Sequence, residues 1–425
     1  MPPANENHRG TTTPRRTENF YVVLTGAATS SENKTSESLC LCVSVANGFR
    51  RVADVLIVGA GPAGAIAALV LARSGARVTL LERATFPRDK LCGDTINPGA
   101  LSILQKLGLE QVTADGLPVD GMVVTGERGV RVTGRYGSGT RGIAIARRVL
   151  DARLAVAAAE AGVRFAQGVL VRQPLMDRDR RVIGVEAITA SGRAERYTAP
   201  VTIAADGRYS RVARALELTR TPASPRRWAV GATFRGVTGL SSLGEMHVRG
   251  DRYIGVAPLP GGDANGCVVT ADRSILRTRN LLFETMRSDR ETASRFARAR
   301  MVAQPSVLGP LALEASTAGM PGLLLAGDAA GFIDPMTGDG LRFAFRGGEL
   351  AAQQALRVLA DGWEDAHLRL EHARRLEFAA KWRFNRTLRR LAASPAAVRA
   401  AEYGAVLSPA LLRRVICYAG DVGIA

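Results

Sequence analysis

The chain has 425 residues, and 46% of them are hydrophobic, which is enough for two or three folded domains with a sizeable core. The formal net charge of +18 comes mostly from arginines that are spread along the chain without interleaved aromatic residues, so we exclude nucleic acid as a partner. The 5 cysteines are too scattered for a disulfide framework, and neither they nor the 4 histidines have the spacing of metal ligands, which predicts a reducing, cytoplasmic location and no metal site.

Residues 1–50 form an N-terminal segment rich in threonine, serine, asparagine and glutamate. This segment shows neither helical nor strand periodicity, and it lacks the long apolar stretch of a secretory signal. A polar segment of this kind cannot bury enough apolar surface to fold, so the sequence predicts a disordered extension.

Residues 54–83 carry the most informative motif of the chain. The apolar run Asp54–Val58 predicts a buried parallel strand, a G-x-G-x-x-G turn follows, and an alanine-rich stretch predicts a helix to about Arg73. A second apolar strand, residues 78–81, leads to an acid. This order is typical of a βαβ unit that binds a dinucleotide. The residues expected at the cofactor in this unit are Gly59, Gly61, Pro62, Ala63, Gly64 and Glu82.

The glycines and the acid of this unit have distinct expected roles. Gly59 permits a tight turn, Gly61 lets the backbone approach a pyrophosphate, and Gly64 lets the helix pack close to the sheet. The free N–H groups at the start of the helix then face anionic phosphates. Glu82 is spaced to accept hydrogen bonds from a ribose diol.

After this unit, helical and strand periodicities alternate along the chain. The predicted helices are residues 97–107, 147–161, 278–303 and 340–359, and a β-hairpin is predicted at 121–134. The predicted strands lie in VRFAQGVLV, VIGVEAITA, ERYTAPVTIAA, residues 228–272 and GLLLAGDAAG. This order predicts a discontinuous cofactor domain (51–120, 143–222 and 300–362), a β-rich substrate domain inserted in it (121–142 and 223–299) and a helical C-terminal segment (363–425).

Two further turns follow buried strands. Asp206-Gly207 ends one strand, and a glycine-rich turn ends another. Because the carboxyl ends of parallel strands meet at one edge of a sheet, both turns are expected at the ligand. The helix predicted at 340–359 would point its N-terminus to the same place, where its dipole would stabilise an anionic ring. The site residues of the second turn are Gly327, Asp328, Ala329, Pro335, Gly338, Gly340 and Leu341.

A K-x-C-G-D loop, residues 90–94, follows the strand that ends at Glu82. Its residues Lys90, Cys92 and Gly93 are candidates for contact with the cofactor, and Cys92 is the candidate catalytic side chain. The alternative interpretation is a solvated basic loop.

Together the motifs G-x-G-x-x-G, R-x-x-L-D, A-D-G-x-x-S and G-D-A-A-G-x-x-x-P-x-x-G-x-G resemble the flavoprotein superfamily of aromatic hydroxylases and geranylgeranyl reductases. The K-x-C-G-D loop and Gly331 are similar to the geranylgeranyl reductase branch. The resemblance implies tightly held FAD in an α/β fold, with a Rossmann-like cofactor domain and an inserted β-rich substrate domain, like that of p-hydroxybenzoate hydroxylase. It also implies that Arg83 and Arg147 lie near the ribose or phosphates, and that Asp206, Gly207 and Asp328 lie beside the cofactor.

The expected substrate is an apolar small molecule. Prenyl reductases of this superfamily have a Y-x-W-x-F-P pattern, whereas this chain has Gly255 and Ala257 where tryptophan and phenylalanine would stand. The leading hypothesis is therefore a monooxygenase that uses transient NAD(P)H to reduce the flavin, and the alternative is a reductase of alkene or isoprenoid substrates. No second nucleotide-binding unit is evident, so the electrons come either from transient NAD(P)H or from a separate reductase.

The tail contains a basic amphipathic helix. Its predicted apolar stripe consists of Leu376, Ala380, Phe384, Leu388 and Leu391, and arginines surround it. Such a helix either lies on an anionic membrane surface or packs on its own domain with a solvated basic face.

Overall fold

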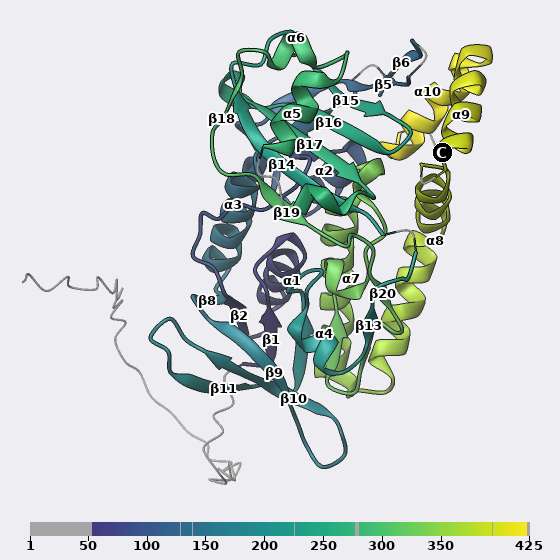
Figure 1. The fold of residues 1–425 in the computed structure, drawn as a ribbon. Helices are drawn as coiled ribbons and strands as arrows, with labels where there is room; N and C mark the ends of the chain where they lie inside the picture. Colours follow the sequence, from purple (N-terminus) through teal and green to yellow (C-terminus); the bar gives the residue numbers. More distant parts are fainter. Residues whose placement is uncertain are drawn as a thin grey trace, which may run out of the picture. The chain divides into compact units, whose positions relative to one another are not determined.

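The computed structural model describes residues 53–422 except 128, 138, 225, 277–279 and 393. The extension predicted at 1–50 lies outside the described residues. These described residues belong to one compact unit, whose helices and strands are labelled in Figure 1. The following elements belong to this unit.

A six-stranded sheet, ordered β21-β22-β12-β1-β2-β8, forms the base of the fold. All strands except β21 run parallel. The three apolar runs predicted as buried strands form β1, β12 and β22, whose residues are all buried. The strands are β1 (Val55–Val58), β2 (Val78–Glu82), β8 (Arg164–Gln167), β12 (Val201–Ala204), β21 (Gly319–Met320) and β22 (Leu323–Leu325).

Three helices, α1 (Pro62–Arg73), α3 (Arg147–Glu160) and α7 (Gly340–Asp361), pack on this sheet, and α1 contacts both α3 and α7. The contact between α1 and α7 is very close, because a Cβ atom on Gly348 would lie 2.3 Å from the Ala63 carbonyl oxygen. The helix predicted at 340–359 is confirmed, and Leu341, Phe345, Ala352 and Ala355 on one side of it are buried, whereas Leu359 is 36% exposed.

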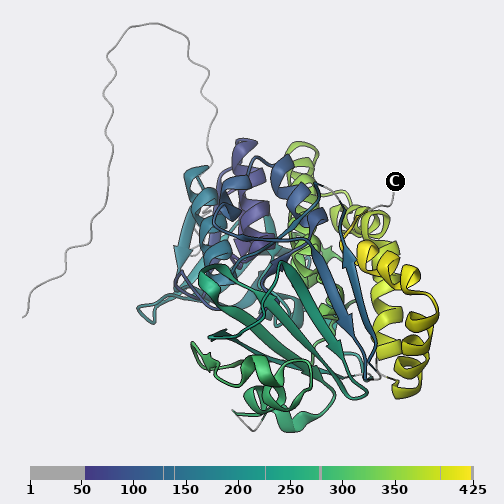
Figure 2. The ribbon, with the colours of Figure 1, turned by 90° about the horizontal axis from the view of Figure 1, so that it is seen from above.

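A second sheet of eight strands combines segments that are far apart in the sequence. The hairpin predicted at 121–134 is confirmed as β5 and β6, and β5 pairs in parallel with β15. Figure 2 shows these two blue strands beside the teal strands of the same sheet. The strands are β5 (Gly121–Thr125), β6 (Arg131–Arg135), β14 (Trp228–Arg235), β15 (Leu243–Val248), β16 (Arg252–Pro258), β17 (Ala264–Thr270), β18 (Arg300–Met301) and β19 (Ser306–Leu308). Because β18 and β19 pair with β14, this sheet continues beyond residue 299.

Two predicted elements differ in detail. The helix predicted at 278–303 is two short helices, α5 (Leu281–Ser288) and α6 (Ala293–Phe296), followed by β18. The segment VRFAQGVLV is two strands, because Gly168 has a φ of +71° and turns the chain between β8 and β9.

The other α-helices and strands before the tail are α2 (Pro98–Lys106), α4 (Arg211–Ala215), β3 (Thr95–Ile96), β4 (Leu117–Val119), β7 (Gly142–Ala144), β9 (Leu170–Met176), β10 (Val182–Ile188), β11 (Ala194–Thr198), β13 (Thr219–Arg220) and β20 (Glu314–Ala315).

The tail forms three helices, α8 (Ala366–Ala392), α9 (Pro395–Leu407) and α10 (Pro409–Ala419), in agreement with the predicted helical segment. Helix α8 packs on its own domain, as one of the two interpretations expected, but its predicted stripe is only partly buried, because Leu376 is 75% exposed and Leu391 is 44% exposed whereas Phe384 packs against Tyr418. The helix packs through a different face that contains Phe378 and Lys381. No helix in the described part of the chain is both long and apolar enough to cross a membrane.

Candidate functional site

A cavity of about 460 Å³ lies where the carboxyl ends of β1, β2, β12 and β22 meet one face of the eight-stranded sheet. Almost every residue predicted at the cofactor lines it. These residues are Gly59, Gly61, Pro62, Ala63, Glu82, Arg83, Lys90, Cys92, Gly93, Arg147, Asp206, Gly207, Gly327, Asp328, Pro335, Gly338, Gly340 and Leu341. Gly64 and Ala329 do not line the cavity, and both are buried in the packing beneath it.

The first glycine turn is shaped by close backbone packing. Gly59 has a φ of +94°, and a Cβ atom there would lie 2.6 Å from the Ala205 carbonyl oxygen. A Cβ atom on Gly64 would lie 1.9 Å from the Gly59 carbonyl oxygen, so the helix start needs glycine at both positions. At Gly61, by contrast, the nearest atom to a Cβ would be an Arg88 nitrogen at 3.7 Å. Gly61 therefore leaves cavity space beside the N-terminus of α1, where a phosphate fits.

Glu82 joins the second strand to this turn. Its Oε2 accepts a hydrogen bond of 2.9 Å from the Ala60 N–H, and its Oε1 accepts one of 3.0 Å from the Ala84 N–H. Arg88 lies 3.9 Å from Oε1. The carboxylate is buried, and each oxygen keeps a lone pair for a hydroxyl donor.

Asp206 and Asp328 present carboxylates at the ends of β12 and β22. Asp206 Oδ2 accepts the Arg211 N–H at 2.9 Å, whereas Oδ1 is buried without a partner among the described residues. Burial raises the pKa of both acids, and Lys90 opposes this effect at Asp328. Burial also lowers the pKa of Lys90, which Asp328 in turn opposes. The orphaned acceptor of Asp206 and the cations Lys90, Arg147 and Arg208 near Asp328 fit a ligand that carries both hydroxyls and phosphates.

The turn before α7 aims a helix N-terminus into the cavity. Asp334 accepts the Met336 N–H at 3.1 Å, and Gly338 adopts a φ of +70°. Asp339, at the start of the helix, makes no side-chain cap, so backbone N–H groups of this 22-residue helix remain available beside Gly340 and Leu341. An anionic ring atom would be stabilised at this position.

The K-x-C-G-D loop is fixed to the eight-stranded sheet, which is inconsistent with a simple solvated loop. Asp94 has a φ of 53°, accepts the Arg147 N–H at 3.1 Å and accepts Asn265 Nδ2 at 2.7 Å. Asn265 Nδ2 also lies 3.0 Å from the Cys92 carbonyl oxygen. Burial raises the pKa of Asp94 to about 6. These contacts hold Cys92 at the cavity wall.

The face of the eight-stranded sheet that lines the cavity carries small residues around Cys267, which forms the floor of the cavity there. Cys267 of β17 pairs with Gly231 of β14 on one side and with Gly255 of β16 on the other, so it is flanked by residues without side chains. Burial raises the pKa of the Cys267 thiol to about 12, and burial also raises the pKa of Cys92. Both sulfurs are therefore neutral thiols at the same cavity.

Sequence reasoning missed Asn265 and Cys267 as site residues. The available signal was their spacing of two in a predicted strand, which places both on one face. Tyr253, the preserved tyrosine of the prenyl reductase pattern, also lines the cavity and donates a hydrogen bond of 2.7 Å to Asp334 Oδ1. Arg227 lies 3.5 Å from the second oxygen of this acid.

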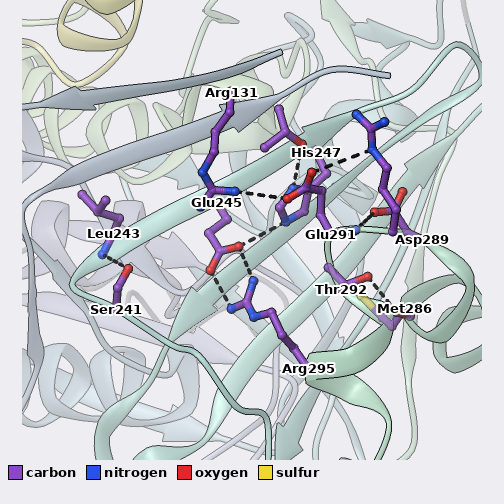
Figure 3. Close-up of polar contacts among 12 residues, drawn as sticks. Arg131, Ser241, Leu243, Glu245, His247, Met286, Asp289, Glu291, Thr292 and Arg295 are labelled. Atoms are coloured by element: carbon purple, nitrogen blue, oxygen red, sulfur yellow. Dashed lines mark hydrogen bonds and ion pairs between the residues drawn. The ribbon is translucent and has the colours of Figure 1, made fainter. Parts of the chain in front are cut away.

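The opposite face of the same sheet carries a buried polar network (Figure 3). Arg295 of α6 makes two hydrogen bonds to Glu245, at 2.6 and 2.7 Å, and His247 lies 3.2 Å from the same carboxylate. Burial opposes ionisation of Glu245, but hydrogen bonds from His247 and Arg295 outweigh it and lower its pKa to about 2. Arg249 and Asp289 form a second buried ion pair at 2.6 Å. This network fastens the sheet to α5 and α6.

The similarity of this chain to known proteins identifies its family. The protein-family model described as FAD binding domain matches residues 52–382, which is most of the chain. The chain belongs to the FAD-binding domain family. This flavoprotein is an oxidoreductase of the superfamily that the motifs resembled, and the expected α/β fold with β-rich sheets and a helical C-terminus is confirmed.

Several curated proteins are similar to this flavoprotein. It is 31% identical over 323 residues to menaquinone reductase of Mycobacterium tuberculosis, covering 71% of this chain and 76% of that protein. It is 28% identical to conditioned medium factor receptor 1 of Dictyostelium discoideum, and the match covers 70% of this chain and 62% of that protein. It is also 28% identical to mouse squalene monooxygenase, and that match covers 81% of this chain and 59% of that protein. The chain thus spans less than two thirds of the length of these last two relatives.

One solved structure of similar fold is a geranylgeranyl bacteriochlorophyll reductase-like protein from Thermoplasma acidophilum. Its TM-score is 0.71 at 22% identity, with 82% of this chain and 90% of that chain covered. The likeness shows a shared fold. Within the described residues, no group of three or more histidine, cysteine or acidic side chains is arranged to hold a metal ion.

Proposed function

We propose that this flavoprotein is an FAD-dependent reductase that adds hydrogen across a carbon–carbon double bond of an apolar small molecule, with NAD(P)H as the reductant. The observation that carries the proposal is the presence of two neutral thiols, Cys92 and Cys267, on the walls of one cavity that also has an apolar wall. This reverses the order of the two hypotheses that the sequence favours.

The cavity residues divide between cofactor and substrate. Gly59, Gly61 and the N-terminus of α1 would hold the pyrophosphate, Glu82 the adenosine ribose, and Asp206 and Asp328 the hydroxyl-rich linker. The turn at Gly338 and Gly340 would face the ring. When bound, FAD supplies hydride transfer.

The neutral Cys92 thiol suits reduction of a double bond, because that reaction needs a proton as well as a hydride. A hydride adds to one carbon, and the Cys92 Sγ–H donates its proton to the other carbon. The Arg147 guanidinium, which lies beside Cys92, stabilises the thiolate that remains until it is reprotonated from solvent. Oxygen activation at the same place would expose both thiols to oxidation.

The substrate wall supports an apolar ligand. Met122, Met246, Val269, Leu311, Phe332 and Met336 line the cavity on that side. Gly255 and Ala257 leave it wider than the bulky residues of the prenyl reductase pattern would. The similarity to a menaquinone reductase, at 31% identity, supports a reductase of an apolar substrate.

The second candidate is the monooxygenase that the sequence first suggested. The similarity to squalene monooxygenase over 81% of this chain favours it. A monooxygenase would use the same flavin and the same apolar wall of the cavity, but its reaction would require oxygen.

Turnover with and without oxygen tests the proposal. The purified protein is supplied with FAD, NADPH and a menaquinone or an allylic isoprenoid alcohol, and the product is analysed by mass spectrometry. A product that gains two hydrogens under anaerobic conditions supports the reductase. A product that gains an oxygen atom only in air would establish the monooxygenase instead.

A further inference from the structure

Helix α8 packs against the rest of the protein through an unusually polar face. Its buried positions recur every three or four residues, at Ala366, Leu370, Arg374, Phe378, Lys381 and Asn385. The polar members have specific partners. Arg374 donates to the Ala330 carbonyl at 3.0 Å, Lys381 lies 2.8 Å from Asp421 and 3.4 Å from Asp339, and Asn385 donates to Asp339 at 3.3 Å. These polar contacts therefore help to set the orientation of α8, together with the buried Leu370 and Phe378 and not with the exposed Leu376 and Leu391.

The opposite face of α8 carries leucines and arginines. We define the outer strip as the exposed residues Leu368, His372, Arg375, Leu376, Ala380, Arg383, Arg386, Thr387, Arg390 and Leu391. Their spacing of three to four residues places them on one side of the helix. Leu368 is 50% exposed and Leu376 is 75% exposed. In Figure 1 this yellow-green helix runs along the edge of the fold beside α7.

The outer strip is strongly positive. Helix α8 contains eight lysines and arginines but only two acids, Glu371 and Glu377. Glu371 pairs with Arg375, and Glu377 faces α7, where Arg342 and Arg346 each lie 3.1 Å from it. Arg383, Arg386 and Arg390 have no ion pair with any described residue.

We propose that the outer strip of α8 binds the surface of an anionic lipid bilayer. The helix has 27 residues and is therefore about 40 Å long, so it can lie flat on a membrane. Arginines would contact lipid phosphates, and the exposed leucines would enter the interfacial region. A nucleic acid or an acidic protein would match the arginines but would leave the leucines without a role, and a second copy of the strip would bring like charges together.

Vesicle sedimentation tests this proposal without reference to the reaction. The FAD-loaded protein is mixed with vesicles of phosphatidylcholine alone or with one third phosphatidylglycerol, at low and at raised salt. Binding is expected only to the anionic vesicles, and it should weaken with salt.

Two variants and a control separate charge from apolar insertion. The triple change Arg383→Gln, Arg386→Gln and Arg390→Gln should weaken binding by roughly 100-fold, at about fivefold for each arginine. The pair Leu376→Ser and Leu391→Ser should weaken it by at least about tenfold. The control removes three exposed arginines elsewhere, Arg172, Arg178 and Arg298, and should retain binding.

Several outcomes would overturn the proposal. They are equal binding to both kinds of vesicle, an equal loss in the control variant, and no loss when the leucines are replaced. Self-association in the absence of lipid that the leucine variant abolishes would identify the strip as a contact between copies of this chain instead.

Discussion

The Ala60 N–H donates a hydrogen bond of 2.9 Å to Glu82 Oε2, so the glycine-rich turn and the acid that ends the second strand are directly joined. The same carboxylate accepts the Ala84 N–H, which fixes its orientation toward the cavity. Glu82 therefore organises the end of the cavity where the adenosine would lie, in addition to offering acceptors to a ribose.

Replacing Glu82 by glutamine should weaken FAD binding. The amide cannot accept both backbone N–H groups and a ribose hydroxyl as the carboxylate does, and hydrogen bonds to a charged group contribute about 1.5–3 kcal/mol each. We expect a loss of affinity of roughly 10- to 100-fold, measured by fluorescence titration of the FAD-free protein. Glu160→Gln, an exposed change on α3, serves as the control. Unchanged affinity in the Glu82 variant would refute this role.

The close contact of α1 and α7 predicts a specific stability effect. In Gly348→Ala the new methyl group meets the Ala63 carbonyl at 2.3 Å, and overpacking of this kind costs about 1–3 kcal/mol. The matched change Gly404→Ala lies in the exposed part of helix α9 with no atom nearby, and it should raise the unfolding free energy by roughly 0.5–1 kcal/mol. Urea unfolding of both variants gives the comparison. Equal effects would show that the contact is not tight.

The two thiols should differ in their effect on turnover. Cys92→Ala removes the proposed proton donor beside Arg147 and should lower kcat by about 100-fold or more while FAD still binds. It should also remove the alkaline limb of the pH–rate profile that the thiol produces. Cys267→Ala should act mainly on KM because Cys267 forms the cavity floor, and Cys417→Ser, in the tail, should have no effect on kcat. Full activity of the Cys92 variant with an unchanged pH profile would exclude the proposed role.

Acid stability should depend on Glu245. Its pKa is about 2 in the folded protein, against an ordinary value of 4.5, so the ionised form stabilises the fold. This contribution is fully present above about pH 4.5 and is lost as the pH falls toward 2. Glu245→Gln should be less stable at neutral pH, and its unfolding free energy should fall less steeply between pH 5 and pH 3. A constant difference from the unchanged protein over that range would contradict this expectation.

Most residues that the sequence assigns to the cofactor lie together at one cavity, because backbone geometry dominates at these turns. Glycine at 59 and 64 is required by contacts of 2.6 and 1.9 Å, and such positions leave a clear signature. Apolar runs such as Val55–Val58 likewise identify strands that are buried on both faces.

The cavity wall formed by the eight-stranded sheet was harder to predict from the sequence. Cys267 and Asn265 act through neighbours on other strands, and their position depends on the register of β14, β16 and β17, which no local pattern encodes. The packing face of α8 was only partly predicted for a similar reason. Periodicity pointed to the leucines, whereas Lys381 and Asn385 are buried by partners that lie some 40 residues away.

The most direct test of the account is the binding of FAD itself. The purified protein should show the visible absorption of an oxidised flavin or take up added FAD at one molecule per chain, and Gly61→Val should abolish this binding by filling the space beside the N-terminus of α1. A folded protein that stays colourless and takes up no FAD, or a Gly61→Val variant that binds FAD normally, would contradict the placement of the cofactor in this cavity.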